Sequence, residues 1–100
     1  MKKELFKAVI SGNISEVISL IKLNINVNSR DMLGKTALHY AIEHNYKYIT
    51  KLLLEKGACP NTIDLTNSEF PLEKASDENI IILLKRAGAS TDIINQDNIH

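Results

Sequence analysis

Two histidines that flank a glutamate are the residues of this sequence best suited to chemistry. His39, Glu43 and His44 could in principle bind zinc, because imidazole and carboxylate groups are common zinc ligands. Helical zinc motifs of the forms HExxH and HxxEH place their histidines four residues apart, on one face of the helix. Here the spacing is five residues, which turns the two rings about 140° apart on a helix of 3.6 residues per turn. The spacing therefore argues against a metal site, and we expect neither a metal nor a cofactor.

A thiol is the second candidate for chemistry. Cys59 is the only cysteine, so it has no internal disulfide partner, and only Lys56 offers a nearby positive charge that could activate it. The sequence contains no nucleophile elbow and no glycine-rich phosphate-binding loop. We therefore predict that the protein is not an enzyme, and we interpret Cys59 as an ordinary hairpin residue.

The composition narrows the remaining functions. The chain has 100 residues, enough for one domain, and 44% of them are hydrophobic. Twelve basic residues balance twelve acidic ones, so the net charge offers no footprint for nucleic acid or for a membrane surface. The longest apolar run, residues 80–84, is too short to span a bilayer. A lone cysteine and the lack of a signal-peptide core favour a reducing compartment, the cytoplasm or the nucleus.

An internal repeat organises the whole chain. A shift of thirty-three residues superposes identical residues, and these pairs are Leu5 and Leu38, Ala8 and Ala41, Leu20 and Leu53, Asn28 and Asn61, and Asp31 and Asp64. A third copy follows with one residue gained before its first helix and three lost between its helices. The repeat predicts three similar structural units stacked on one another.

Each unit has the pattern of two helices followed by an extended segment. Thr36 can cap a helix on which Leu38, Ala41 and Ile42 share one face. The second helix has a stripe of its own, formed by Ile49, Leu52, Leu53 and Lys56. Gly57 and Gly88 stand where the second helices should end.

Two motifs in the central unit resemble those of the ankyrin-repeat family. Gly34-x-Thr36-Ala37-Leu38-His39-x-Ala41 is similar to the family's GxTPLHxA signature, with alanine in place of proline, and residues 52–58 resemble its second-helix ending. The resemblance implies an all-α ankyrin-repeat solenoid of about three units with short β-hairpin fingers. The expected domain covers residues 1–92, in units of about 1–28, 29–61 and 62–92, and a polar tail covers residues 93–100.

The outer units resemble caps of the stack. The first unit starts directly at a helix, and the third carries six charged residues that suit an end face with no neighbour, namely Glu73, Lys74, Asp77, Glu78, Lys85 and Arg86. Residues 93–97 also resemble the hairpin that would open a fourth repeat, so the alternative that the chain continues stays open.

The resemblance implies roles for individual residues. His39 is expected to tie backbone groups of neighbouring units together. Asn28 and Asn61 are expected to stabilise turns through their own side chains, although the family's asparagine at this place can also accept hydroxylation. In this family the finger tips and the concave helix face bind partners. The corresponding residues are Arg30, Met32, Leu33, Lys35, Glu43, His44, Ile63, Leu65, Thr66 and Glu69, with Ile10 and Ser11 in the first unit.

The function that the resemblance implies is binding of another folded protein, as an adaptor or a regulator. We expect a monomer that binds neither nucleic acid nor membrane, inside a cell, or inside a host cell if the source is a parasite, symbiont or virus. Two alternatives stay open. The chain could be a regulatory or targeting segment of a larger enzyme or effector, or a structural stack that self-associates.

A metal assay tests the interpretation of the histidines. Protein purified without a histidine tag should contain no stoichiometric zinc by elemental analysis, because His39 and His44 do not share a helix face. About one zinc per chain that disappears in His39→Ala would instead establish a metal site.

Overall fold

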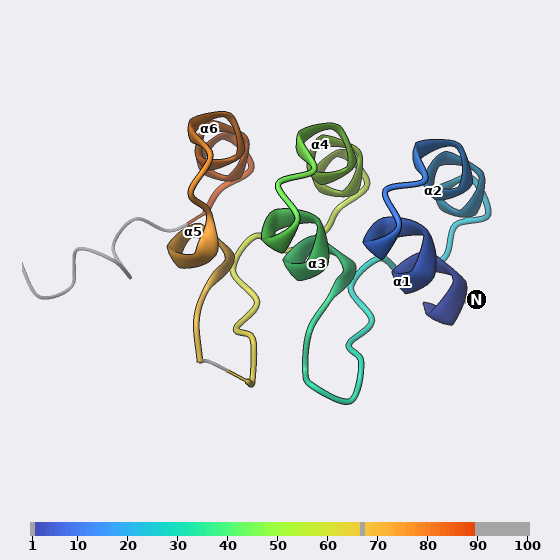
Figure 1. Ribbon diagram of the computed structural model, residues 1–100, viewed down its shortest axis with the longest axis horizontal. Coiled ribbons are helices and arrows are strands. Elements are labelled where there is room, and N and C mark those ends of the chain that lie inside the picture. The colour runs from blue at the N-terminus through green and yellow to red at the C-terminus, as the bar shows by residue number, and fades with distance from the viewer. Residues whose placement is uncertain (1, 67, 90–100) are drawn as a thin grey trace, which may run out of the picture.

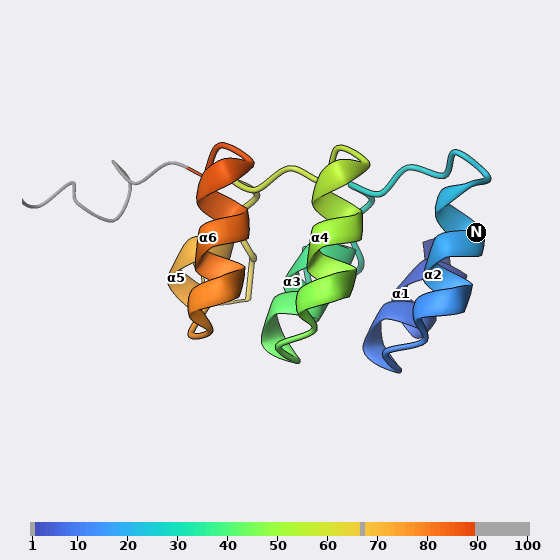
Figure 2. The ribbon, with the colours of Figure 1, turned by 90° about the horizontal axis from the view of Figure 1, so that it is seen from above.

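Six helices form three consecutive pairs. A computed structural model describes residues 2–66 and 68–89. The helices are α1 (Lys2–Ile10), α2 (Ile14–Ile21), α3 (Ala37–Glu43), α4 (Lys47–Glu55), α5 (Pro71–Lys74) and α6 (Glu78–Arg86). Each pair lies beside the next in chain order, with α1, α3 and α5 in one layer and α2, α4 and α6 in the other (Figures 1 and 2). The predicted all-α repeat stack is confirmed.

Short polar side chains stand at the start of α2, α3 and α6. Asn13 caps α2 by accepting a hydrogen bond from the N–H of Glu16, and Asp77 caps α6 by accepting one from the N–H of Asn79. Thr36 is the N-cap of α3, as the sequence predicts. Because these caps satisfy amides that a short helix leaves unpaired, each helix can start close to the end of the preceding turn.

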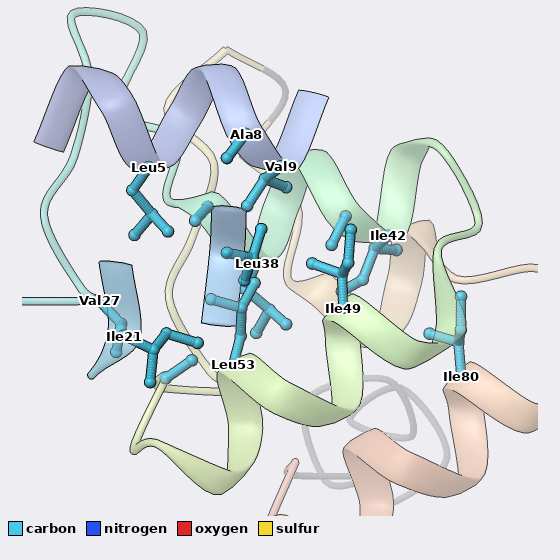
Figure 3. Close-up of a cluster of buried hydrophobic side chains, with 14 of the residues drawn as sticks. Leu5, Ala8, Val9, Ile21, Val27, Leu38, Ile42, Ile49, Leu53 and Ile80 are labelled. Atoms are coloured by element: carbon cyan, nitrogen blue, oxygen red, sulfur yellow. The ribbon is translucent and has the colours of Figure 1, made fainter. Parts of the chain in front are cut away.

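The central pair of helices supplies the middle of the hydrophobic core. Leu38 and Ile42 of α3, and Ile49 and Leu53 of α4, are buried (Figure 3). The helix α3 contacts both α1 and α5, and α4 contacts both α2 and α6. Lys56 does not belong to this stripe, contrary to our expectation, because α4 ends at Glu55 and leaves Lys56 exposed.

Two long loops project from the stack below α1, α3 and α5 (Figure 1). We call residues 29–36 the first finger and residues 62–66 with 68–70 the second finger. Our expectation of short β-hairpins is wrong in detail: the described residues contain one isolated bridge, Asp64 with Glu69, and no regular strand. In the first finger, the Asp31 carboxylate accepts hydrogen bonds from the N–H groups of Leu33 and Lys35. Such local bonds favour a turn over a strand ladder.

The third unit has a shortened first helix. The helix α5 has four residues where α3 has seven. The three residues missing from the third copy are therefore lost from the first helix and not, as we expected, from the segment between the helices. Pro71 takes the first helical position, and the Glu73 carboxylate accepts a hydrogen bond from the N–H of Phe70 at 2.8 Å. The helix ends at Lys74, because the following residue, Ala75, has an extended backbone conformation. The predicted tail, residues 93–100, and the fourth-repeat resemblance at residues 93–97 lie outside the described residues.

Truncation of a central leucine tests the stack. Leu53→Ala should lower the free energy of unfolding by about 2–5 kcal/mol, because it leaves a cavity where the side chain is fully buried. A urea titration followed by circular dichroism measures this loss. Leu23→Ala is the matched control, since Leu23 is 61% exposed. A loss below about 1 kcal/mol for Leu53→Ala would contradict its place in the core.

Candidate partner-binding surface

His39 joins two consecutive units. Its buried ring lies with Nδ1 2.9 Å from the backbone nitrogen of Thr36 and with Nε2 2.9 Å from the carbonyl oxygen of Thr62. Burial lowers the pKa of His39 and outweighs the bond to Thr62, which raises it. The structural role implied by the family resemblance is confirmed. Among the described residues, no three histidine, cysteine or acidic side chains form a group able to hold a metal.

Asn28 also reaches into the following unit. Its amide nitrogen donates to the carbonyl oxygen of Gly57 at 3.0 Å, and its amide oxygen accepts from the N–H of Cys59 at 2.7 Å. Asn61 repeats the first contact with Gly88, at 3.2 Å. We expected these asparagines to stabilise their own turns. Instead they connect neighbouring units, because the end of the next second helix presents its free carbonyl group to them. Hydroxylation of either asparagine stays untested.

The base of the first finger is held by a tyrosine. The Tyr40 hydroxyl donates a hydrogen bond to the Asp31 carboxylate, and its ring meets the Phe6 ring edge-on at a centroid distance of 5.8 Å. Burial alone would raise the pKa of Asp31, but the bonds from Tyr40 and from two backbone N–H groups lower it. The pKa of Tyr40 is raised by burial and by the bond to Asp31. The Asp31 carboxylate thus accepts its hydrogen bonds from groups of the protein itself.

A chain of alternating charges connects the first finger, α3, α5 and the second finger. The Glu43 carboxylate accepts from Lys35 Nζ at 2.9 Å and from Lys74 Nζ at 2.7 Å, and Lys74 Nζ also donates to the Asp64 carboxylate at 2.8 Å. Burial alone would raise the pKa of Asp64, but the bonds from Lys74 and from the N–H of Thr66 lower it to about 2. Burial alone would likewise raise the pKa of Glu43, whereas Lys74 and Lys35 lower it.

Lys74 contradicts one prediction from the sequence. We placed it on a charged end face, but its side chain is only 10% exposed and points back to the central unit. The carboxylates of Asp64 and Glu43 raise the pKa of Lys74 despite its burial, which alone would lower it. The matching aspartates Asp31 and Asp64 were a visible signal of a polar position in each finger. Lys74, which bonds Asp64, stands thirty-four residues after Tyr40, which bonds Asp31, so the register of the repeat relates the two contacts.

The two fingers stack in the register of the repeat. The Arg30 guanidinium donates to the carbonyl oxygen of Ile63, and the Thr66 hydroxyl donates to the carbonyl oxygen of Leu33, both at 3.4 Å. Leu65 lies directly on Gly34, where an added Cβ would come within 2.5 Å of the Leu65 side chain. The thirty-three-residue shift of the repeat relates Arg30 to Ile63, and the structure places the two residues side by side.

Three apolar side chains remain exposed on the stacked fingers. Met32 is fully exposed, at 103% of the reference area, while Leu33 is 53% and Leu65 66% exposed. Single exposed apolar residues are ordinary, but a contiguous group on a small protein marks a surface for interaction. Ile63 is half-buried, whereas Thr66 is exposed beside Leu65.

The other residues predicted to bind a partner lie at the end of α3, in the second finger and at the end of α1. Glu43 and His44 end α3, where the His44 ring stacks on Tyr46 and its Nδ1 lies 2.8 Å from the carbonyl oxygen of Tyr40. Glu69 bridges to Asp64 within the second finger. Ile10 and Ser11, at the end of α1, contact Tyr46 and Ala8 through hydrogen bonds. The structure brings the finger residues together and leaves Lys35 and Glu43 paired with each other.

Comparison with known proteins gives a consistent result. The family profile described as ankyrin repeats (three copies) matches residues 3–64. An ankyrin repeat protein of Acanthamoeba polyphaga mimivirus is 42% identical over 86% of this chain, and the cyclin-dependent kinase inhibitor 2A of Monodelphis domestica is 32% identical over 91%. A glycerophosphocholine phosphodiesterase of Schizosaccharomyces pombe is 38% identical over 79% of the chain. The chain spans 12%, 54% and 7% of the lengths of these relatives, respectively.

Acid titration tests the network of charges. The pKa of Asp64 falls from its ordinary 3.8 to about 2 in the folded protein, so the resulting stability is present above about pH 4 and is lost as the pH falls towards 2. Asp64→Asn should lower the free energy of unfolding at pH 7 by about 1–2 kcal/mol and flatten its decrease between about pH 4 and 2. Urea titrations at a series of pH values measure both effects.

Glu55→Gln is the control for the Asp64→Asn titration, because Glu55 is exposed. This substitution should change the free energy of unfolding by less than about 0.5 kcal/mol. An unchanged pH dependence in Asp64→Asn would show that the bond from Lys74 to Asp64 does not stabilise the fold.

Proposed function

The chain belongs to the ankyrin-repeat family, and we propose that it is a non-catalytic module that binds a folded partner protein through its finger tips and the face of α1, α3 and α5. The observation that carries this proposal is the group of exposed apolar side chains on the fingers, Met32, Leu33 and Leu65. Burial of exposed apolar surface is the dominant favourable contribution to most protein–protein association.

The proposed contact surface consists of the ten residues expected from the sequence, Arg30, Met32, Leu33, Lys35, Glu43, His44, Ile63, Leu65, Thr66 and Glu69. The apolar tips would form its centre, and the polar side chains its rim. Lys35 and Glu43 already form an ion pair with each other, so their role would be to fix the shape of the surface. A partner would not need to neutralise them, which favours a contact driven by shape and apolar area.

The names of two relatives indicate two settings in which such a module could bind a partner. One is named as an inhibitor of a kinase, and another as a phosphodiesterase of which this chain spans only 7%. The second case supports the alternative that the present chain serves as a regulatory segment of a larger enzyme or effector. Relatives in mimivirus and Fowlpox virus support action inside a host cell, in the cytoplasm or nucleus. No helix among the described residues is long and apolar enough to cross a membrane.

A double substitution on the fingers tests the proposed surface. Leu33→Ser with Leu65→Ser should keep the thermal midpoint within a few degrees, since both side chains are largely exposed. It should abolish binding of the partner recovered by pull-down from the natural host and identified by mass spectrometry.

Two results would contradict this proposal. A large fall in the thermal midpoint would place the two leucines in the core, and undiminished binding by a stable mutant would move the surface to the opposite face. Size-exclusion chromatography with light scattering distinguishes the expected monomer from a self-associating stack.

A further inference from the structure

A groove of about 570 Å³ lies between α1 and the first finger, at the N-terminal end of the stack. Lys3 and Phe6 of α1 line one side, and Arg30, Asp31, Met32 and Leu33 of the first finger line the other. Its walls are mostly apolar, through the Phe6 ring and the side chains of Met32 and Leu33. The groove lies on the side of the first finger away from the second finger.

The equivalent place one repeat later is filled. Residues thirty-three positions further along the chain are Thr36, His39, Ile63, Asp64, Leu65 and Thr66. Between them lies the backbone of the first finger: Leu65 covers Gly34, and the Thr66 hydroxyl donates to the carbonyl oxygen of Leu33. The groove is therefore the position that a preceding finger would take, and the described residues place no segment in it.

The charges of the groove determine what it can accept. Asp31 is the one acidic residue among those that line it, and its carboxylate already accepts bonds from Tyr40 and from the N–H groups of Leu33 and Lys35. Lys3 and Arg30 are exposed at its edge, and the Arg30 guanidinium also donates one hydrogen bond to the carbonyl oxygen of Ile63 in the second finger. An occupant that carries carboxylates would therefore meet two cations and no free anion from the lining.

The shape of the groove adds a second requirement. Met32 stands where Leu65 stands in the second finger, and Leu65 approaches Gly34 so closely that any Cβ there would lie 2.5 Å from it. An occupant that stacks on Met32 in the same way needs a glycine at that point. A second copy of this chain would offer its second finger, which contains no glycine between Ile63 and Glu69.

We propose that this groove binds an exposed turn of a partner protein that contains a glycine flanked by acidic side chains. The turn stacks on the first finger as the first finger stacks on the second, with its glycine over Met32 and its carboxylates towards Lys3 and Arg30. This inference rests on the proposed function and names the chemistry of the segment recognised. It also adds a binding position beside the finger tips.

Disulfide-constrained peptides displayed on phage provide the probe. Panning against the whole chain should enrich peptides with a glycine next to aspartate or glutamate. Their affinity, measured by fluorescence polarisation, should fall at least about tenfold in Met32→Asp, because the change adds a negative charge and removes the apolar contact. Lys3→Glu should weaken binding in the same direction.

Matched variants keep the experiment specific. Leu23→Asp and Lys47→Glu change an exposed leucine and an exposed lysine outside the groove, and both should bind the peptides as the unaltered protein does. Thermal midpoints by circular dichroism confirm that each variant is folded. Enrichment of no peptide, enrichment of basic or glycine-free peptides, or equal binding to Met32→Asp would each overturn the inference.

The same variants separate this inference from the proposed function. Leu65 does not line the groove. Lys3 lines the groove and is not part of the finger surface, so natural-partner binding that is lost in Leu65→Ser but retained in Lys3→Glu would leave the finger surface intact as a proposal and reject the groove. Binding of that partner that survives both substitutions would reject both.

Discussion

One buried imidazole fixes the position of the second finger relative to α3. Because His39 Nδ1 accepts from the N–H of Thr36, the ring must carry its proton on Nε2, which donates to the carbonyl group of Thr62. A charged ring would carry protons on both nitrogens and lose the first bond, so burial and geometry both favour the neutral form. With Thr62 held there, the second finger starts at a defined point, and Asp64 two residues later meets Lys74.

The two interfaces between units share an apolar core and differ in the contacts added to it. Between the first and second units, α1 packs on α3 through an apolar core and the edge contact of Phe6 with Tyr40. Between the second and third units, Leu72 of α5 and Ile80 and Leu84 of α6 join the same apolar core. The helix α5 has only four residues, and its Lys74 adds contacts with two carboxylates. A buried ion pair adds little net stability over an apolar contact but strongly disfavours misplacement. The charges therefore orient the short third unit more than they stabilise it.

The sequence predicts the repeat and its contacts where residues recur at the same spacing. The thirty-three-residue register correctly places Arg30 beside Ile63, and Thr36 and His39 have the roles expected. It fails for Lys74, because we judged that residue by its charge alone. Lys74 follows Tyr40 by thirty-four residues, the shift that relates Leu72 to Leu38, and it binds Asp64 as Tyr40 binds Asp31. It also fails where a side chain competes with the backbone, because the bonds of Asp31 to Leu33 and Lys35 replace the strands of the expected hairpin.

The exposed finger surface follows from the repeat itself. Leu65 and Met32 occupy the same position in successive fingers. Leu65 rests on Gly34 and is 66% exposed, whereas Met32 is uncovered and 103% exposed. Among the described residues, no segment covers Met32 as the first finger is covered by Leu65. The same position of the repeat therefore joins two fingers in one case and presents an exposed apolar side chain in the other. The proposed binding surface thus needs no residue outside the pattern of the repeat.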